Sequence, residues 1–324
     1  MDGFDAKDRA MLYELERDAR VPISAMAKKL RLSKQVAFYR LGRLIKSGAI
    51  VGFYTVVNAA KLGYSDFEIW FRLSDASEGG LEKVLGVLKG WLYSRWVAKC
   101  GLGFDVGYGL YARNAVHFNA QLNELLGLFG DNVSSYEYSS IVEIDNFSVA
   151  ALSKVMAERK MKVHFGDEPR KEKLSQNEAK VLKAVSQDAR ARIVDLAKKL
   201  GLSEKAAKMN LAELERRKII TGFRAVPRFS KLGLLNFELL FALSPSGKGR
   251  LVELKRYCAS HPSVTYMISS IGKWQATVAI VVKNQDEFDV VFSEIRGSFR
   301  DIIRDCEIVL VKEFVKFNYL PPIE

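Results

Sequence analysis

The residues best suited to chemistry in this sequence are amide, aromatic and cationic side chains crowded into one short stretch. Arginine can hold guanine and glutamine can hold adenine through paired hydrogen bonds in the major groove of DNA, and lysine suits phosphates. These residue types recur at helical spacing between positions 34 and 46. The stretch therefore predicts a helix that reads nucleic acid, with the candidate residues Ser33, Lys34, Gln35, Phe38, Tyr39, Arg40, Arg43 and Lys46.

The flanking sequence predicts the elements that position this helix. A short amphipathic helix ends near Leu30, three residues turn, and Ser33 offers a side-chain oxygen as the N-cap of the next helix. We expect Val36, Leu41 and Leu44 to face the core, and Gly48 to end the helix. Helix, tight turn and basic helix are the layout of a helix-turn-helix. The plain alternative is an amphipathic helix whose basic face is merely solvated.

The same pattern returns 170 residues later without a gap. From 18 to 74, 25 of 57 positions are identical with those of the second copy, which indicates a tandem duplication. The second basic helix has Asn210 where the first has Arg40, and Glu213 where the first has Arg43. We expect it to bind DNA with weaker or different sequence reading, or to serve as a protein-contact or structural module. Its candidate DNA-binding residues are Ser203, Lys205, Lys208 and Asn210.

Positive charge is concentrated in the two segments that hold these helices. Residues 1–63 carry 12 Lys+Arg against 6 Asp+Glu, and residues 170–233 carry 17 against 7. Residues 64–150 carry 6 against 11, and residues 234–324 carry 11 of each. This division indicates a polyanion that is bound by the two basic segments.

The remaining segments alternate strand and helix in the order β-α-β-β-α-β. This order is that of a ferredoxin-like (ACT-like) domain, with two helices on one face of an antiparallel sheet. The other face is left apolar and needs a partner, so we expect the two sheets to pack face to face. The sequence thus predicts an α+β chain of five segments: a winged helix-turn-helix at 1–63, a ferredoxin-like domain at 64–150, a charged linker at 151–173, a second winged helix-turn-helix at 174–233 and a second ferredoxin-like domain at 234–324. The linker reads as a solvated tether, with a basic arm on phosphates as the alternative.

This arrangement resembles the Lrp/AsnC (leucine-responsive, feast/famine) transcription regulators, and the likeness covers nearly the whole chain twice. The residues that carry it are Leu30, Leu32, Ser33, Arg40, Arg43, Leu44, Gly48, Ile50, Gly52, Phe53 and Lys61–Tyr64, followed in the second copy by His261–Val264 and Gly272–Trp274. Members usually carry one such unit per chain and dimerise through their sheet domains. The resemblance therefore implies an intramolecular pseudo-dimer that binds double-stranded DNA and regulates transcription; whether fused chains form a further homo-oligomer is left open.

The resemblance also implies a small-molecule effector, such as an amino acid, near the glycine-containing turn of each central hairpin. The corresponding positions are Gly101, Asp105, Gly272 and Gln275. The usual acidic residue is present as Asp105 and is replaced by Gln275 in the second copy. The first copy also has glycine at both 101 and 103, which shifts its turn.

Some relatives of this fold are siroheme decarboxylases, which gives an alternative function. Such a site needs histidines and basic residues around a tetrapyrrole, and the only histidines are His117, His164 and His261. None has an evident acid or metal partner in the sequence, so we expect no catalytic residue, metal or cofactor. The three cysteines suit neither a zinc site nor a disulfide framework. With no membrane-length apolar run and no secretory pattern, we expect a cytoplasmic location.

Overall fold

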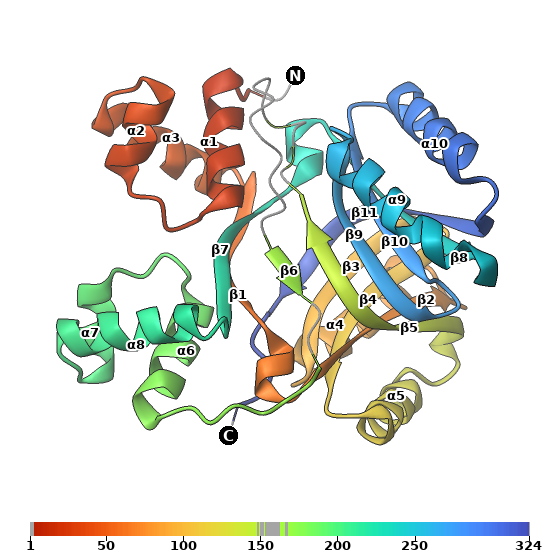
Figure 1. The fold of residues 1–324 in the computed structure, drawn as a ribbon, viewed down its shortest axis with the longest axis horizontal. Coiled ribbons are helices and arrows are strands. Elements are labelled where there is room, and N and C mark those ends of the chain that lie inside the picture. Colours follow the sequence, from red (N-terminus) through yellow and green to blue (C-terminus); the bar gives the residue numbers. More distant parts are fainter. Residues whose placement is uncertain (1–2, 148, 150–151, 153–162, 166–167, 324) are drawn as a thin grey trace. The chain divides into compact units, whose positions relative to one another are not determined.

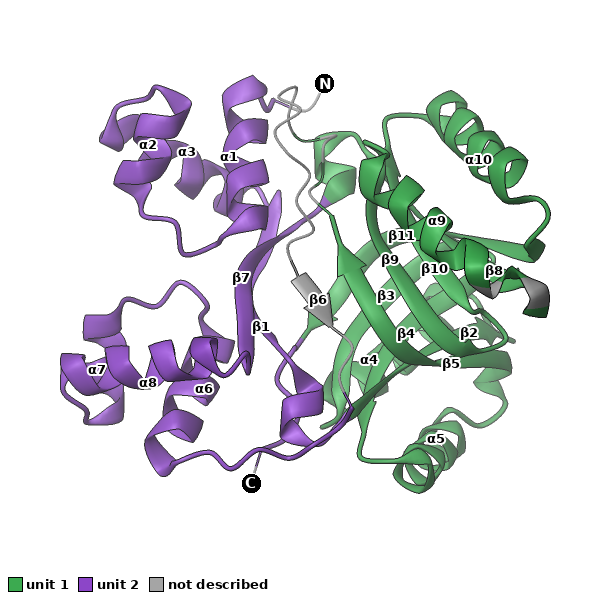
Figure 2. Ribbon diagram, viewed as in Figure 1, with its two compact units in different colours: residues 1–2, 65–167, 229–317 green, residues 3–64, 168–228, 318–324 purple. Residues whose placement is uncertain are grey.

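The computed structural model describes the chain except for residues 1–2, 148, 150–151, 153–162, 166–167 and 324. It divides into two compact units (Figure 2), each built from both copies of the repeat. Within the described residues, the sheet unit comprises 65–167 and 229–317, and the helix-turn-helix unit comprises 3–64, 168–228 and 318–324. Two predicted boundaries therefore need correction. Residues 229–233 were expected in the second winged helix-turn-helix but belong to the sheet unit, and residues 318–324 were expected in the second ferredoxin-like domain but belong to the helix-turn-helix unit. The segment 318–324 joins the helix-turn-helix unit because Tyr319 stacks on Tyr54 and Tyr64 donates to the Pro322 carbonyl.

The helix-turn-helix unit holds two three-helix modules (Figure 1), each followed by one strand. Both modules begin with a capping box, in which Asp5 and Asp8, or Ser175 and Glu178, satisfy each other's free backbone amides. Gly201 ends the second helix of the second module in the left-handed conformation. The elements are α1 (Ala6–Arg17), α2 (Ile23–Leu30), α3 (Lys34–Lys46), β1 (Ile50–Val57), η1 (Ala59–Leu62), α6 (Gln176–Gln187), α7 (Ile193–Leu200), α8 (Glu204–Arg216) and β7 (Ile220–Pro227).

The two modules are joined by an antiparallel ribbon of β1 and β7. Two arginines at equivalent positions form hydrogen bonds between the modules. Arg20 donates to the carbonyls of Ala189 and Ala191 at 2.8 and 3.0 Å, and Arg190 donates to the carbonyl of Ala19. Each guanidinium also lies over a phenylalanine of the ribbon. The strands that follow the two predicted winged helix-turn-helix modules are therefore also the seam between them.

The sheet unit contains two β-α-β-β-α-β units, as predicted. Its elements are β2 (Ser65–Leu73), α4 (Glu78–Gly90), β3 (Ser94–Leu102), β4 (Phe104–Ala112), α5 (Ala115–Phe129), η2 (Gly130–Asn132), β5 (Val133–Asn146) and β6 (Val163–Phe165), then η4 (Phe229–Leu232), β8 (Leu235–Leu243), η5 (Pro245–Gly247), α9 (Lys248–Ser260), β9 (Val264–Gly272), β10 (Ala276–Val282), α10 (Gln285–Phe299) and β11 (Ile303–Phe317).

The two sheets join at both edges into a closed ring. The strand order is β2-β4-β3-β11-β8-β10-β9-β5, and β5 pairs again with β2. The seams between the copies are the antiparallel pairs β3–β11 and β5–β9. The sheets do bury their apolar faces against each other as predicted, but as the interior of a barrel whose edge pairing the sequence does not reveal.

Alternation along the strands separates the barrel interior from the outer layers. Odd positions of β2, from Phe67 to Leu73, pack with α4 and α5, whereas Trp70 joins an inner cluster with Trp96, Phe104 and residues of the second copy. The second sheet packs against α9 and α10 in the same way. Gly109 on β4 makes room for this interior, because a Cβ there would collide with the indole of Trp96.

The even positions of β2 and β8 also place polar side chains inside the barrel. Glu68 and its equivalent Glu238 are almost fully buried. Burial, together with the charge of Glu238, raises the pKa of Glu68 to about 8, and burial raises the pKa of Glu238 to about 7 although Tyr266 donates to it. Arg95 lies 3.8 Å from the Asp66 carboxylate in the same interior.

The charged linker is not simply a solvated tether. Residues Val163–Phe165 form β6, which pairs with β5. The last residues of the linker run along η1, where the backbone amides of Arg170 and Glu172 donate to the carbonyls of Ala60 and Lys61 at 2.8 and 2.9 Å. The remaining linker positions 151, 153–162 and 166–167 lie outside the described residues.

Candidate nucleic-acid interface

Helix α3 is positioned by its N-cap and by three small or aliphatic side chains. Ser33 accepts a hydrogen bond from the Val36 amide at 3.2 Å, as the sequence predicts. The buried residues of the helix are Ala37, Leu41 and Leu44. Val36, expected in the core, is 41% exposed, because the buried face begins one residue later. This places Val36 on the same side as the candidate reading residues.

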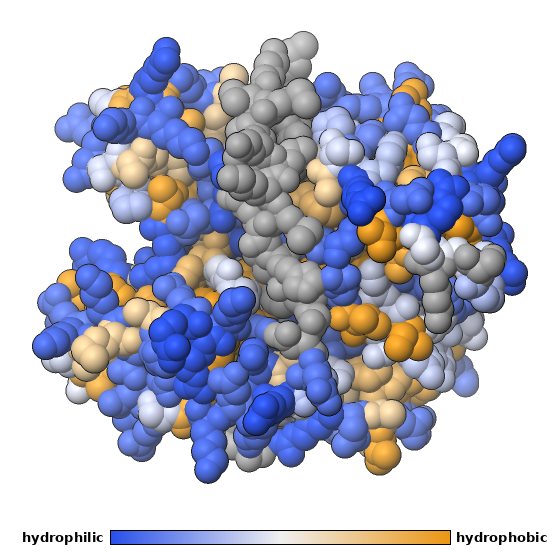
Figure 3. All heavy atoms as spheres, viewed as in Figure 1, coloured by the Kyte–Doolittle hydropathy of each residue, from blue (hydrophilic) through white to orange (hydrophobic). Residues whose placement is uncertain are grey.

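The outer face of α3 presents amide, cationic and large apolar side chains. Lys34, Gln35 and Lys46 are exposed, and Phe38 and Tyr39 are 70% and 69% exposed. Large apolar side chains in such a position mark a surface that meets a partner. Figure 3 shows apolar patches scattered over a mainly hydrophilic surface of the helix-turn-helix modules.

Arg40 and Arg43 are turned toward α1 and away from this outer face. The Arg40 Nη1 atom lies 2.9 Å from Asp8 Oδ1 and 2.8 Å from both carboxylate oxygens of Asp5, and Arg43 pairs with Asp8 Oδ2. These contacts raise the pKa of Arg40. Because Asp8 is fully buried, the two arginines compensate its charge and hold α3 against α1. The DNA contacts predicted for them remain a prediction.

Helix α8 has the same serine N-cap as α3, but its polar side chains have different hydrogen-bond and ion-pair partners. Ser203 accepts from the Ala206 amide at 3.1 Å, and Lys205 and Lys208 are exposed. The Asn210 side chain donates to the Ala206 carbonyl of its own helix at 2.8 Å. Glu213 pairs with Arg216 on the helix surface.

The counterpart of the buried Asp8 is Glu178, and its partner is Arg217, 2.9 Å away just after α8. In the first module, Arg40 and Arg43 within α3 pair with the buried carboxylate, whereas in the second module Arg217 just after α8 does so. Asn210 and Glu213 stand where α3 has its two arginines. The sequence difference between α3 and α8 is not only a difference in reading residues.

Three exposed apolar residues on these helices were not among the predicted DNA-binding residues. Val36, Ile45 (46% exposed) and Met209 (61% exposed) lie on the outer faces of α3 and α8. The signal that could have identified them is their spacing from predicted residues, because Val36 is three residues before Tyr39, Ile45 seven after Phe38 and Met209 four after Lys205, and residues at these spacings share a helix face.

The four candidate effector positions lie at the hairpin turns of the sheet unit. Asp105 accepts from the Leu73 amide at 2.8 Å, and Gln275 accepts from the Leu243 amide at 2.7 Å at the equivalent place. Gly272 has φ of 149° and lies against the backbone of Tyr138. Gly101 lies in the exposed end of β3. These contacts show a structural role in both copies, and effector binding remains a prediction.

The histidines with described side chains are held locally. His117 accepts from the Arg113 amide at 3.1 Å, and its pKa is lowered by burial and by Arg113. His261 accepts from the Ser263 amide and lies 3.4 Å from Glu294. The described part of the chain contains no group of three or more His, Cys, Asp or Glu residues suited to a metal. The side chain of His164 lies outside the described ones.

Membrane insertion by a helix has no support in the described residues, whose helices are all too short or too polar to cross a bilayer.

Comparison with known proteins points to one family. A model described as "Winged helix-turn-helix DNA-binding" matches residues 4–51 and 174–221. The "Proline dehydrogenase transcriptional activator" of Rhodobacter capsulatus is 32% identical over 83 residues, which are 25% of this chain and 54% of that protein. The "HTH-type transcriptional regulator LrpA" of Pyrococcus horikoshii is 39% identical over 61 residues, or 19% of this chain and 43% of that protein. The chain thus spans about half the length of these curated relatives.

In these segments the chain is similar to regulators of the Lrp/AsnC family. The two matches to one helix-turn-helix model agree with the tandem duplication. The whole chain also has the fold of a solved protein described as "the siroheme decarboxylase NirDL", with a TM-score of 0.61 at 15% identity over 99% of this chain and 95% of that one. At this identity the likeness concerns the fold alone.

Proposed function

We propose that this chain is a DNA-binding transcriptional regulator whose α3 reads base sequence and whose α8 contributes mainly phosphate contacts. The observation that carries the proposal is the pair of winged helix-turn-helix modules joined by the β1–β7 ribbon in one positively charged unit. Both recognition helices keep their Ser N-cap and an exposed outer face. The curated relatives named above are regulators, which supports the same reading.

On the proposed DNA contact surface, Gln35 and Phe38 face base edges and the lysines face phosphates. Gln35 suits adenine, and the Phe38 ring suits the thymine methyl group. Lys34, Lys46, Lys205 and Lys208 are exposed cations for the backbone. Because α3 and α8 expose different residues, the preferred site is asymmetric. Its two halves lie about one helical turn (roughly 34 Å) or a multiple apart.

The proposal is tested by selecting bound sequences from random duplex DNA with the purified chain. We expect an asymmetric consensus whose affinity falls steeply with salt concentration. The variant Q35A should lose sequence preference, and K205A/K208A should weaken binding to all sequences alike. Arg256→Ala, which removes an exposed cation from α9 in the sheet unit, is the matched control. An absence of salt-dependent DNA binding in the wild type rules out the proposal.

An effector at the hairpin turns extends this proposal. Asp105 and Gln275 differ in charge at equivalent positions, so one amino-acid ligand would be bound by the two copies with unequal affinity. Calorimetric titration with single amino acids measures this directly. Heat signals that are unchanged in Asp105→Asn would exclude a role for that carboxylate.

The siroheme-decarboxylase alternative is kept because the fold match extends over 99% of the chain. We propose that this chain is not an enzyme, since the described histidine side chains are engaged with local backbone amides. An absorbance band after reconstitution with a tetrapyrrole, together with loss of its carboxyl groups, would favour the alternative.

A further inference from the structure

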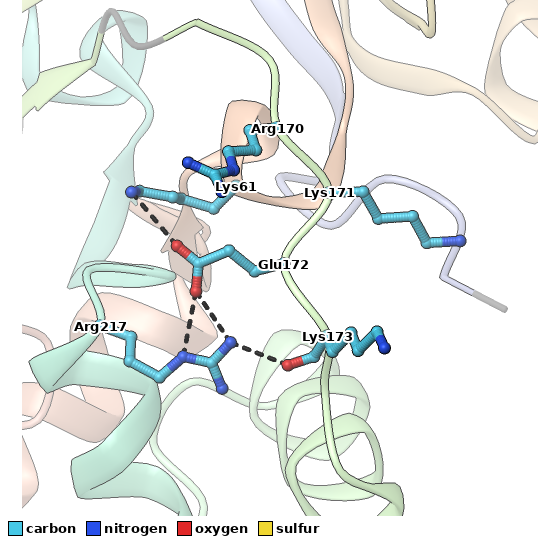
Figure 4. Close-up of a pocket in the computed structure, with 6 residues that line it drawn as sticks. All are labelled: Lys61, Arg170, Lys171, Glu172, Lys173 and Arg217. Carbon is cyan, nitrogen blue, oxygen red and sulfur yellow. Dashed lines mark hydrogen bonds and ion pairs between the residues drawn. The ribbon is translucent and has the colours of Figure 1, made fainter.

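A pocket of about 480 Å³ opens in the helix-turn-helix unit beside the end of the linker. Five of its lining residues are cations and one is a carboxylate: Lys61, Arg170, Lys171, Lys173, Arg217 and Glu172 (Figure 4). Lys61 comes from η1, Arg217 follows α8, and the other four are consecutive linker residues. The volume suits a small molecule, and the charge suits an anion.

The backbone of the linker explains how these side chains are sorted. The amides of Arg170 and Glu172 both donate to carbonyls of η1, so alternate linker residues face opposite sides. Figure 4 shows Arg170 and Glu172 on the side of Lys61, with Lys171 and Lys173 pointing the other way. Three cations from separate segments therefore surround one carboxylate.

Glu172 occupies the centre of this group as an anion supplied by the chain itself. Its Oε1 lies 3.2 Å from Lys61 Nζ, and its Oε2 accepts from Arg217 Nε and Nη2 at 3.1 and 2.8 Å. The hydrogen bond from Arg217, followed by that from Lys61, lowers the pKa of Glu172 against the effect of burial. The surroundings thus stabilise negative charge at this point.

The Glu172 carboxylate does not engage every hydrogen-bond donor in the pocket. Among the residues that the structure describes, the Arg170 guanidinium has no hydrogen-bond or ion-pair partner, although it lies beside Lys61 in the same pocket. Arg217 is fixed from behind by Glu178 at 2.9 Å, so its position does not depend on a ligand. The geometry is that of a preorganised anion site with one donor group unused.

We propose that Lys61, Arg170 and Arg217 bind the phosphate group of a phosphate ester, in competition with the Glu172 carboxylate. A phosphate brings more oxygens and more charge than the carboxylate, so it can also engage Arg170. Its source is either a free nucleotide-sized molecule or the backbone of bound DNA. Only the DNA source rests on the proposed function.

The site should occur once per chain. In the first copy, Ser47 stands at the position of Arg217, so one of the three cations has no counterpart. A ligand site inherited from the repeat would occur twice. The stoichiometry therefore separates this pocket from the hairpin-turn positions in the sheet unit.

The experiment titrates the full chain with inorganic phosphate, ADP and the selected DNA duplex, each measured by calorimetry at two salt concentrations. The variants are Arg170→Ala, Glu172→Gln and the control Arg256→Ala. For a free phosphate ester, we expect one ADP per chain, about tenfold weaker binding in Arg170→Ala, as for one charge-assisted hydrogen bond, and tighter binding in Glu172→Gln. For a DNA phosphate, Arg170→Ala should weaken duplex binding and reduce the salt slope by about one, with ADP binding absent.

The outcomes separate the two proposals. Binding of ADP that depends on Arg170, without any DNA binding, upholds the pocket and contradicts the regulator. If Arg170→Ala matches Arg256→Ala in every titration, the phosphate site is wrong. The same holds if Glu172→Gln lowers thermal stability while leaving every affinity unchanged, because Glu172 is then only a structural link.

Discussion

Asp8 is fully buried in α1, and its two carboxylate oxygens are held by Arg40 and Arg43 of α3. A buried carboxylate that loses a partner costs far more than an exposed one. We expect Arg40→Ala to lower the free energy of unfolding by about 1–3 kcal/mol, as measured by urea denaturation. Asp8→Asn should make the same arginine substitution less costly, since it removes the buried charge, keeps an acceptor for the capping box and leaves only the more exposed Arg40–Asp5 contact.

Asn210→Ala in α8 is the comparison for this cycle, because Asn210 bonds only to its own helix among the described residues. Equal losses for Arg40→Ala with and without Asp8→Asn would show that the ion pair contributes nothing. DNA-binding defects of Arg40 and Arg43 variants must be judged against this stability loss.

Phe38 is the most exposed aromatic residue of α3, and its proposed contact is a thymine methyl group. Replacing thymine by uracil in the selected site removes that methyl and nothing else. We expect wild-type affinity to fall about threefold to fourfold at one position, the effect of roughly one buried methylene. Phe38→Ala should bind both duplexes equally, whereas Met209→Ala in α8 should still discriminate. Discrimination that persists in Phe38→Ala would place the methyl elsewhere.

At the scale of elements, the barrel depends on two glycines of β4 that face tryptophans. A Cβ at Gly107 would lie 2.6 Å from the Trp70 ring, and one at Gly109 would collide with Trp96. We expect Gly109→Ala to destabilise the sheet unit by about 1–3 kcal/mol in denaturant melts followed by tryptophan fluorescence.

Gly127 on α5 is the matched control, because a Cβ there meets nothing within 4 Å. Gly127→Ala should stabilise slightly, by up to about 1 kcal/mol, since alanine favours the helix. A Gly109→Ala protein as stable as wild type would mean that the interior can rearrange around Trp96.

These elements also show what the sequence could reveal. The repeat, the N-caps Ser33 and Ser203 and the β-α-β-β-α-β order follow from local patterns, and the structure has all of them. The ring closure does not follow, because alternation assigns faces but not edge partners. The orientation of Arg40 does not follow either, since a long side chain on the flank of a helix can turn to either side. The strand β6 is too short for a periodic signal.

At the scale of the whole molecule, the buried pair Glu68 and Glu238 couples the barrel to pH. Raising their pKa from the usual 4.5 to about 8 and about 7 means that the folded chain retains protons that the unfolded chain has lost. The contribution of this pair to the free energy of unfolding is therefore fully present below about pH 4.5 and is lost as pH rises toward 8, by on the order of a few kcal/mol. The charged and titratable groups around the pair are Asp66, Arg95, Tyr266 and Cys100.

Glu68→Gln removes one of these protons while keeping the shape. We expect its melting temperature to decline less between pH 5 and 8 than that of the wild type, because only Glu238 is left to lose its proton in this range. Glu253→Gln on the exposed surface of α9 is the control and should follow the wild type. Parallel curves for wild type and Glu68→Gln would show that the pair does not govern this decline.

The two seams of the barrel, β3–β11 and β5–β9, have a consequence for how such a chain can evolve. In a dimer of identical subunits, one change in the gene alters both sides of the symmetry axis at once, and residues on the axis meet their own replacements. Here each side is encoded separately. A mutation in β3 can be compensated by a second mutation in β11. The two halves can also acquire different functions while they are still encoded by one gene.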